Sequence, residues 1–339
     1  IEQQLFVHLV APEEVAAVAQ NVLNAIHRAK KNTAKPALDP DLLETAVTRL
    51  VPLFDTAHGG FGRAPKFPST AVLTLFLFYY QQSGAQPFLD RVTHTLKEMA
   101  CGGVYDQFAG GFRRYSVYEA WQVPHFEKML YDNAQLAPLY FLTYQASKDP
   151  FFKESGMDIL DYVLRDMTDT QGGFYAAQDA DSEGGEGSFY TWSPKEIKAI
   201  LGAETADLVC QYYQITETGN FEGKSIPHRT SSSSVEDPSL QALAAQIGAS
   251  ETTVAEVLRS ARATLYAERE KRPKPFRDEK IMTSWTSLMI GAFVSGYQVT
   301  RDTRYRTAAV QAADFILDHL HQDGRLLHTF KNGKGKLCA

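Results

Sequence analysis

The chain has 339 residues, 44% of them apolar, and a formal net charge of −6. At this size roughly 75% of the unfolded surface can be buried, so the fold needs no disulfide or metal. Lys and Arg are spread along an acidic chain, which argues against a nucleic-acid partner. The longest apolar run, residues 71–80, is too short to span a bilayer, and no signal segment opens the chain. We therefore expect a cytoplasmic protein without a membrane partner.

The three cysteines, Cys101, Cys210 and Cys338, are odd in number and widely spaced. They form no Cys-x-x-Cys pair, which disfavours both a disulfide framework and a cysteine zinc site. This composition favours a reducing compartment and predicts no cofactor and no metal in the site. The chain begins at Ile1 instead of Met, which indicates a part of a longer protein.

Apolar residues recur at spacings of three and four along most of the chain, the period of amphipathic helices. The predicted helices follow one another closely, with glycine-rich loops between pairs. This pattern predicts an all-α fold, a closed ring of helix pairs (an α/α toroid) with short β-hairpins in its loops. Residues 1–38 are expected to be a helical segment or linker from a preceding domain, and residues 39–339 a barrel domain. The main predicted helices are 15–30, 40–54, 69–84, 87–100, 126–146, 151–167, 240–247, 252–271, 284–299 and 304–320.

Residues 102–135 concentrate glycines, aromatic rings and titratable side chains. A loop is predicted to lead into a helix on which His125, Lys128 and Asp132, at spacings of three and four, share one face. A histidine near a helix N-terminus should have a lowered pKa, leaving a neutral imidazole that can accept a proton. A solvated polar face is the alternative interpretation.

The rings of this loop can pack onto the fold, or they can offer flat platforms for a sugar ring. Arginines beside them can donate paired hydrogen bonds to hydroxyl groups. Asp106 is expected to brace the backbone amides of the loop itself. The candidate substrate-binding residues are Tyr105, Arg114, Tyr115, Trp121, Glu127, Tyr131 and, from a later helix, Trp285.

Residues 179–186 form the acidic tip of a predicted hairpin with strands at 172–175 and 188–192. The tip begins like an EF-hand loop, but Tyr190 occupies the position of the bidentate Glu, so an EF-hand is rejected. A looser calcium site across Asp179–Glu186 remains open. Paired carboxylates also suit glycoside hydrolysis. The candidate catalytic residues are therefore His125, Asp132, Asp179 and Asp181.

Several other enzyme classes lack their motifs in this chain. Toroids that protonate alkenes use Asp-x-Asp-Asp, whereas Ser182 stands at the fourth position here. No Gly-x-Ser-x-Gly elbow, phosphate loop or dinucleotide fingerprint occurs.

Five segments resemble a known family: GGFGRAPKFP at 59–68, the run from 102 to 136, FYAAQDADSEGGEGSFYTW at 174–192, GNFEGKSIPH at 219–228 and RPKPFRDEKIMTSW at 272–285. They are similar to the thioredoxin-fused six-hairpin (α/α)6-barrel family, which includes a spermatogenesis-associated thioredoxin-domain protein. The resemblance covers about residues 40–339. It implies an (α/α)6 toroid like that of N-acylglucosamine 2-epimerases, incomplete at the C-terminus of this chain. It also implies a small sugar ligand and a thioredoxin-like domain elsewhere in the full-length protein.

Two departures from that family stand out. The thioredoxin-like domain and its Cys-x-x-Cys are missing from this chain, and the family's Trp-Asn-Gly is Trp285-Thr286-Ser287.

The resemblance and the polar cluster together predict a carbohydrate-active enzyme, either a sugar epimerase or isomerase or a glycosidase-like hydrolase. In the epimerase version His125 exchanges a proton beside a carbonyl, Asp132 orients it, and Asp179 or Asp181 serves the opposite face. The alternative is a non-catalytic module that binds or presents a substrate for the thioredoxin-like domain.

Overall fold

The computed structural model describes residues 12–31, 41–229 and 238–338. The chain divides into two compact units, Ile1–Ala46 and Val47–Ala339. In the first, α2 spans Pro12–Lys31, and α3, Leu42–Leu50, runs across the boundary. The predicted domain boundary after residue 38 lies outside the described residues. Within the described ranges, no helix is both long and apolar enough to cross a membrane.

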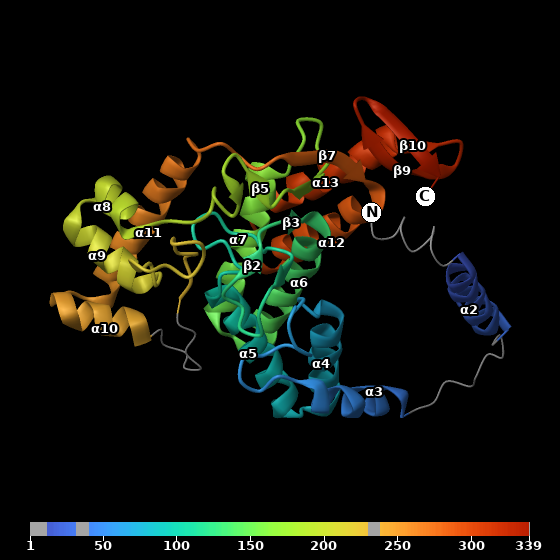
Figure 1. Ribbon diagram of the computed structural model, residues 1–339, viewed down its shortest axis with the longest axis horizontal. Coiled ribbons are helices and arrows are strands. Elements are labelled where there is room, and N and C mark those ends of the chain that lie inside the picture. The colour runs from blue at the N-terminus through green and yellow to red at the C-terminus, as the bar shows by residue number, and fades with distance from the viewer. Residues whose placement is uncertain (1–11, 32–40, 230–237, 339) are drawn as a thin grey trace. The chain divides into compact units, whose positions relative to one another are not determined.

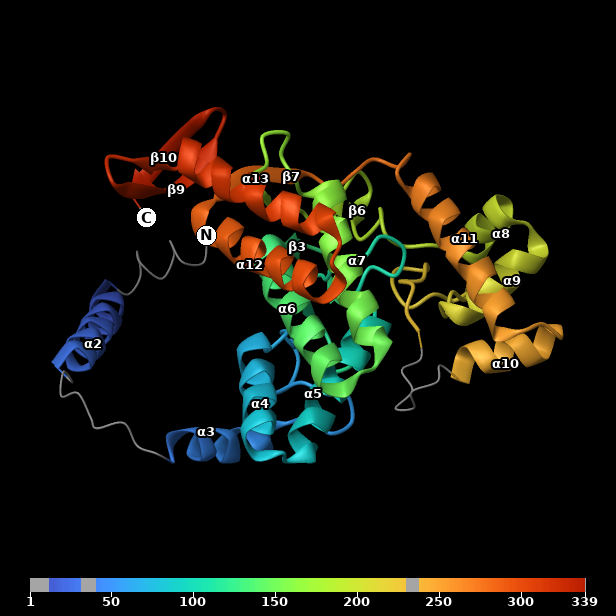
Figure 2. The same ribbon diagram turned by 180° about the vertical axis from the view of Figure 1, so that it is seen from behind.

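The second unit is built mainly from consecutive helix pairs, which confirms the predicted fold class. One to three residues join the two helices of a pair. Two groups of helices are visible in both views of the ribbon (Figures 1 and 2): α6, α7, α12 and α13 pack side by side, and α8 to α11 form the other group. The pairs are α4 (Thr70–Ser83) with α5 (Gln86–Cys101), α6 (Leu130–Ser147) with α7 (Pro150–Asp166), α8 (Pro194–Leu201) with α9 (Ala203–Tyr212), α10 (Pro238–Ile247) with α11 (Glu251–Arg269), and α12 (Thr283–Thr300) with α13 (Thr303–His319).

Local chemistry sets where these helices begin, and α8 is the clearest case. Ser193 Oγ accepts a hydrogen bond from Glu196 N at 3.3 Å, and Glu196 Oε2 accepts one from Ser193 N at 2.7 Å. This reciprocal capping box satisfies two backbone donors that the first turn cannot pair internally. The sequence Ser193-Pro194-Lys195-Glu196 itself predicts a capping box at the start of a helix, and the structure confirms it.

Ser193→Ala is expected to destabilise the protein by about 1 kcal/mol, because a backbone donor of the first turn of α8 loses its acceptor. Urea unfolding checks this, and amide exchange in α8 should accelerate. Ser295→Ala is the control: its hydroxyl bonds only to the Gly291 carbonyl within α12, so stability should hold or rise slightly. Equal losses in both variants would contradict the assignment.

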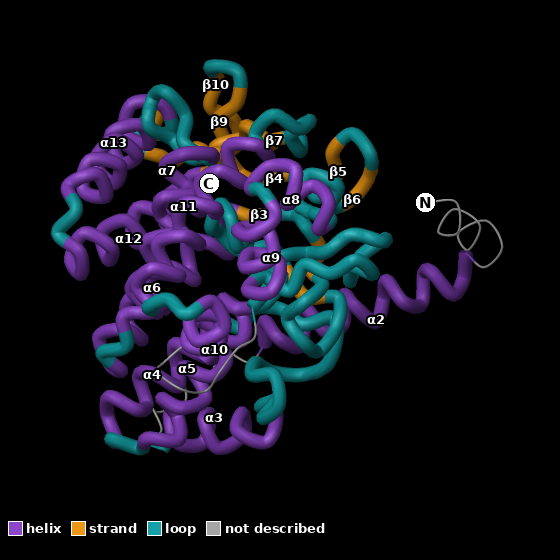
Figure 3. Tube along the Cα trace, turned by 90° about the vertical axis from the view of Figure 1, so that its left-hand side faces the viewer, coloured by secondary structure: helices purple, strands orange, loops and turns teal. Residues whose placement is uncertain are grey.

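The connections between helices assemble a six-stranded sheet with the order β10-β9-β7-β4-β3 and β8 paired beside β9. The predicted hairpin between 172–175 and 188–192 is wrong, because β4 pairs with the distant β3 and β7 instead. The acidic tip forms its own hairpin from β5 (Asp181–Ser182) and β6 (Gly185–Glu186). Figure 3 shows these strands at the end of the unit where α6 and α12 begin. The strands of the sheet are β3 (Lys128–Met129), β4 (Tyr175–Gln178), β7 (Arg277–Met282), β8 (His321–Gln322), β9 (Arg325–Lys331) and β10 (Lys334–Cys338).

Helix α6 begins at Leu130, four residues later than predicted, because the residues before it are extended. Here β2 (Pro124–His125) pairs with β1 (Tyr115–Ser116), and β3 pairs with β4. Successive side chains of an extended segment point to opposite sides. The prediction that His125, Lys128 and Asp132 share a helical face is therefore wrong, as is the placement of His125 at a helix N-terminus.

The loop at 102–112 is buried throughout and forms part of the core. As predicted, Asp106 Oδ1 accepts hydrogen bonds from the loop amides of Phe108 and Ala109, each at 3.2 Å. A Cβ at Gly103 would lie 1.9 Å from the carbonyl oxygen of Gln122, so this position tolerates only glycine. The loop is therefore part of the packed interior.

Candidate active site at the loop end of the helices

Seven of the predicted site residues meet where β1, β2 and β3 lead into α6. Direct contacts connect Arg114, Tyr115, His125 and Glu127 with one further residue, Glu186 of β6, and connect Tyr131 with Trp285. Asp132 follows Tyr131 in α6 and interacts electrostatically with Arg114 and Glu127. We call this set the loop-end cluster: Arg114, Tyr115, His125, Glu127, Tyr131, Asp132, Glu186 and Trp285.

Two carboxylates and one ring hold the imidazole of His125. Its Nδ1 lies 2.8 Å from Glu186 Oε1, and its Nε2 lies 3.7 Å from Glu127 Oε2. The imidazole stacks on Tyr115, with ring centroids 5.1 Å apart and planes inclined by 23°. These contacts fix the orientation of a partly exposed imidazole that remains accessible to a ligand.

Glu186, not Asp132, is the carboxylate that orients His125. Besides the imidazole, Glu186 accepts a hydrogen bond from the backbone amide of Phe126 at 3.3 Å. The acidic tip thus reaches across to β2, a contact between residues about 60 positions apart in sequence. The acidity of the tip was the only signal in the sequence that pointed to Glu186.

An ion pair and two rings form the next part of the cluster. Arg114 Nη1 donates to Glu127 Oε2 at 3.0 Å, and the backbone amide of Arg114 donates to the Glu127 carbonyl at 2.9 Å. The rings of Tyr131 and Trp285 meet edge to face, with centroids 4.8 Å apart. The first turns of α6 and α12 are therefore in contact.

Asp132 is the titratable group of the cluster with the most altered acidity. It lies in the first turn of α6, where Oδ2 is buried and has no hydrogen-bond partner among the described residues. The pKa of Asp132 is raised to about 7, mainly by burial. The positive charge of Arg114 opposes this rise, and the negative charge of Glu127 adds to it. The carboxyl group is therefore close to half protonated at neutral pH, as suits a general acid or base.

A cavity of about 440 Å³ adjoins the cluster. Three predicted residues, Glu127, Asp179 and Trp285, line it, together with Asp278 and Lys280 of β7, which the sequence did not indicate. Volumes of roughly 300–1,000 Å³ are usual for sites that bind small molecules. The cavity therefore has room for a small polar ligand beside Glu127 and Trp285.

The structure places three predicted residues outside both the cluster and the cavity that adjoins it. The Tyr105 hydroxyl donates to Asp158 Oδ2 at 2.6 Å and lines a different cavity. Trp121 is buried, and its indole NH donates to the His58 carbonyl at 2.8 Å. Asp181 is exposed on β5, where the backbone register sets it opposite Glu186.

The acidic tip, residues 179–186, was the predicted calcium site. The amide of Asp181 donates to Asp179 Oδ1 at 3.3 Å, a turn-bracing contact. Throughout residues 12–31, 41–229 and 238–338, no three His, Cys, Asp or Glu side chains converge as a metal site would require. A looser calcium site at Asp179–Glu186 stays a prediction.

No family model matches the chain. Over 308 residues it is 37% identical to spermatogenesis-associated protein 20 of Homo sapiens, covering 83% of this chain and 39% of that protein. It is 36% identical over 295 residues to uncharacterized protein B0495.5 of Caenorhabditis elegans, and the match covers 80% of this chain and 40% of that protein. The chain thus spans about two fifths of the length of these curated relatives.

Comparison with solved structures gives weaker likenesses. D-mannose isomerase matches at 13% identity with a TM-score of 0.36, over 90% of this chain and 93% of that one. Cellobiose 2-epimerase from Spirochaeta thermophila matches at 16% identity with a TM-score of 0.35, over 88% and 92%. From its sequence relatives, this chain belongs to the family that includes spermatogenesis-associated protein 20.

Proposed function

We propose that the loop-end cluster binds a small sugar and moves a proton on it, as a sugar epimerase or isomerase does. The observation that carries this proposal is Asp132, a half-buried carboxyl group with a pKa of about 7. Its Oδ2 is buried and has no hydrogen-bond partner among the described residues, and its cluster adjoins the 440 Å³ cavity. A group whose pKa lies near the working pH both accepts and returns protons effectively.

The surrounding side chains suit a sugar. Tyr131 and Trp285 offer ring surfaces for the apolar face of a pyranose. Arg114 and Glu127 supply a charged donor and acceptor for hydroxyl groups, and Asp278 and Lys280 supply a second such pair at 3.1 Å across the cavity wall. A few placed polar groups among rings are typical of small-molecule sites.

Epimerisation beside a carbonyl removes a proton from carbon and returns it to the other face. In our proposal Asp132 and His125 act on one face of the sugar, where they remove the proton, and Glu186 holds the imidazole of His125 by its Nδ1. Asp179, on the cavity wall, is the candidate for the opposite face of the sugar. A glycosidase-like reaction would use paired carboxylates instead and would not require His125.

In the full-length protein, we further propose that a thioredoxin-like domain is the partner of this barrel. The proposal rests on the family resemblance and on the length of the relatives, of which this chain spans about two fifths.

Binding of neutral sugars tests the location of the site. A reducing hexose, N-acylhexosamine or disaccharide at 100 times its dissociation constant should stabilise the wild-type protein by about 2.7 kcal/mol. Trp285→Ala should weaken that binding at least tenfold, because it removes a ring from the cavity wall.

Tyr118→Ala is the matched control, since it removes an exposed ring outside the cluster and should leave binding unchanged. Titration calorimetry or a thermal-shift series measures all three proteins. If no sugar of these classes binds, or if Trp285→Ala binds as tightly as wild type, the proposed site is wrong.

A further inference from the structure

A second cavity, of about 600 Å³, lies between the sheet and the C-terminal ends of α7 and α11. Side chains of β7 alternate between the two cavities: Arg277 and Glu279 line this one, whereas Asp278 and Lys280 line the cavity beside the loop-end cluster. Alternation along a strand places these pairs on opposite faces of the sheet. Phe276 lines both cavities, and the other lining residues of the second cavity differ from those of the proposed sugar site.

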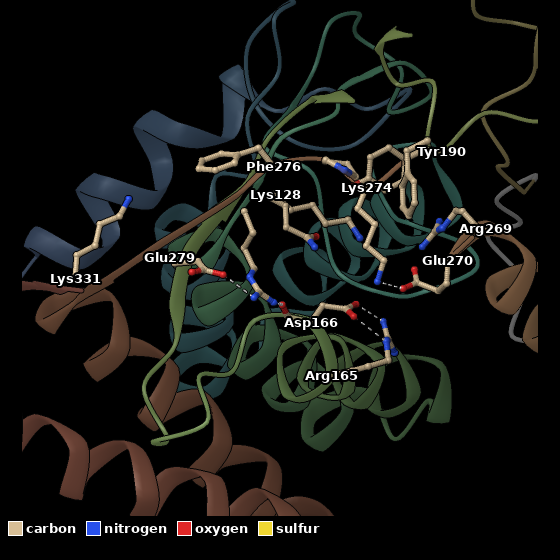
Figure 4. Close-up of a pocket in the computed structure, with 14 residues that line it drawn as sticks. Lys128, Arg165, Asp166, Tyr190, Arg269, Glu270, Lys274, Phe276, Glu279 and Lys331 are labelled. Carbon is tan, nitrogen blue, oxygen red and sulfur yellow. Dashed lines mark hydrogen bonds and ion pairs between the residues drawn. The ribbon is translucent and has the colours of Figure 1, made fainter. Parts of the chain in front are cut away.

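Positive charge dominates its wall, although the whole chain carries a net charge of −6. Arg165, Lys274 and Arg277 have carboxylate partners at 2.7, 2.5 and 2.8 Å within the wall, and Figure 4 shows the first two pairs. At the edge, Lys331 lies 3.3 Å from Asp278. Six cationic side chains line the cavity against three acidic ones: Lys128, Arg165, Arg269, Lys274, Arg277 and Lys331 against Asp166, Glu270 and Glu279.

The inner wall holds the most unbalanced charge. Lys128 and Arg269 are both at most 2% exposed, and both pair with the single buried carboxylate of Asp106, at 2.9 and 2.8 Å. Arg113, equally buried, adds a third cation to the same carboxylate. Buried charge without a counter-ion is costly, so an anion in the cavity would be strongly favoured.

Two of the arginines also have unused hydrogen-bond donors. Nε of Arg269 and Nε of Arg277 are buried and have no partner among the described residues. Buried donors are nearly always satisfied by protein, water or ligand.

Burial, opposed by Asp106 and reinforced by Arg113, lowers the pKa of Lys128 to about 8, so its amine is charged at neutral pH.

We propose that this cavity binds a phosphate monoester, with its phosphate between Lys128, Arg269 and Lys274 and its organic part against Tyr190 and Phe276. All five side chains line the cavity. Figure 4 shows Tyr190, Arg269 and Lys274 close to one another, whereas the ring of Phe276 points away from them. A dianionic phosphate offsets more buried positive charge than one carboxylate does and accepts several charge-assisted hydrogen bonds. The rings supply the apolar surface that an ester has and inorganic phosphate lacks.

Calorimetry at constant ionic strength tests this with inorganic phosphate, a hexose 6-phosphate and the neutral hexose. Lys274→Gln and Arg277→Gln remove cations at the partly exposed rim, so both variants should fold. Each should weaken hexose phosphate binding about tenfold or more. Lys271→Gln is the matched control: it removes the same charge three residues from Lys274, where the amine pairs with Glu268 outside the cavity.

Three results would overturn the proposal: no binding of either phosphate compound by wild type, equal losses in Lys271→Gln and Lys274→Gln, or binding of the ester no tighter than that of inorganic phosphate. Trp285→Ala should leave hexose phosphate binding at this cavity intact while weakening neutral sugars. The two proposals therefore fail or succeed separately.

Discussion

Asp106→Asn is expected to destabilise the protein by about 3–5 kcal/mol at neutral pH, because it leaves Lys128, Arg269 and Arg113 buried without their carboxylate. Asn keeps the size of the side chain and an oxygen for the loop amides, so the loss reports the charge. Burial opposes ionisation, but Arg269, Lys128 and Arg113 together hold the pKa of Asp106 well below its usual range. Its stabilising contribution is therefore present above the unfolded pKa of about 3.9 and is lost as the pH falls through the folded pKa.

Urea unfolding at pH 7, pH 4 and pH 3 measures this effect: the difference from wild type should persist at pH 4 and shrink only as the pH falls further toward the folded pKa. Asp302→Asn is the control, because Asp302 caps α13 at the surface and Asn caps helices equally well. Asp106→Asn within 1 kcal/mol of wild type at pH 7 would show that the buried cations do not need this carboxylate.

Asp132→Asn is expected to lower any proton-transfer activity at least 100-fold while making the protein more stable above neutral pH. Burial raises the folded pKa of Asp132 to about 7, against about 3.9 when unfolded. The contribution of Asp132 to stability is therefore complete below pH 4 and is lost as the pH rises through about 7. Asn avoids that loss, so the variant should gain about 2–4 kcal/mol at pH 8 and almost nothing at pH 4.

Unfolding of wild type and variant at both pH values checks the gain, again beside Asp302→Asn. The same gain at pH 4 and pH 8, or a loss at pH 8, would show that the carboxyl group is not raised and would remove the main support for its catalytic role.

The helix pairs were predictable because apolar spacing and caps are local properties of the sequence. Gly84 ends α4 in the left-handed conformation and Ser193 caps α8, both where the sequence indicated a boundary. The start of α6 was not predictable, because pairing of β3 with β4, nearly 50 residues further along, keeps residues 128–129 extended. Tertiary pairing there overrides a helical pattern.

In the site, too, the local features were predictable from the sequence and the long-range contacts were not. Arg114, His125, Glu127 and Asp132 come from one continuous motif, so short-range geometry was enough to suggest that they meet. Lys128 was expected beside His125, but the extended backbone turns it into the core. Its pairing with Asp106, and that of Asp106 with Arg269, depends on contacts across 22 and 163 residues that no local pattern encodes.

Proton exchange in heavy water tests the central claim most directly. A sugar that binds at the loop-end cluster should gain deuterium at the carbon beside its carbonyl, at a rate that Asp132→Asn lowers at least 100-fold and Asp302→Asn does not change. Mass spectrometry of the recovered sugar measures both. Binding of the sugar with neither deuterium uptake nor release of new reducing ends would contradict a catalytic role and favour the non-catalytic binding module.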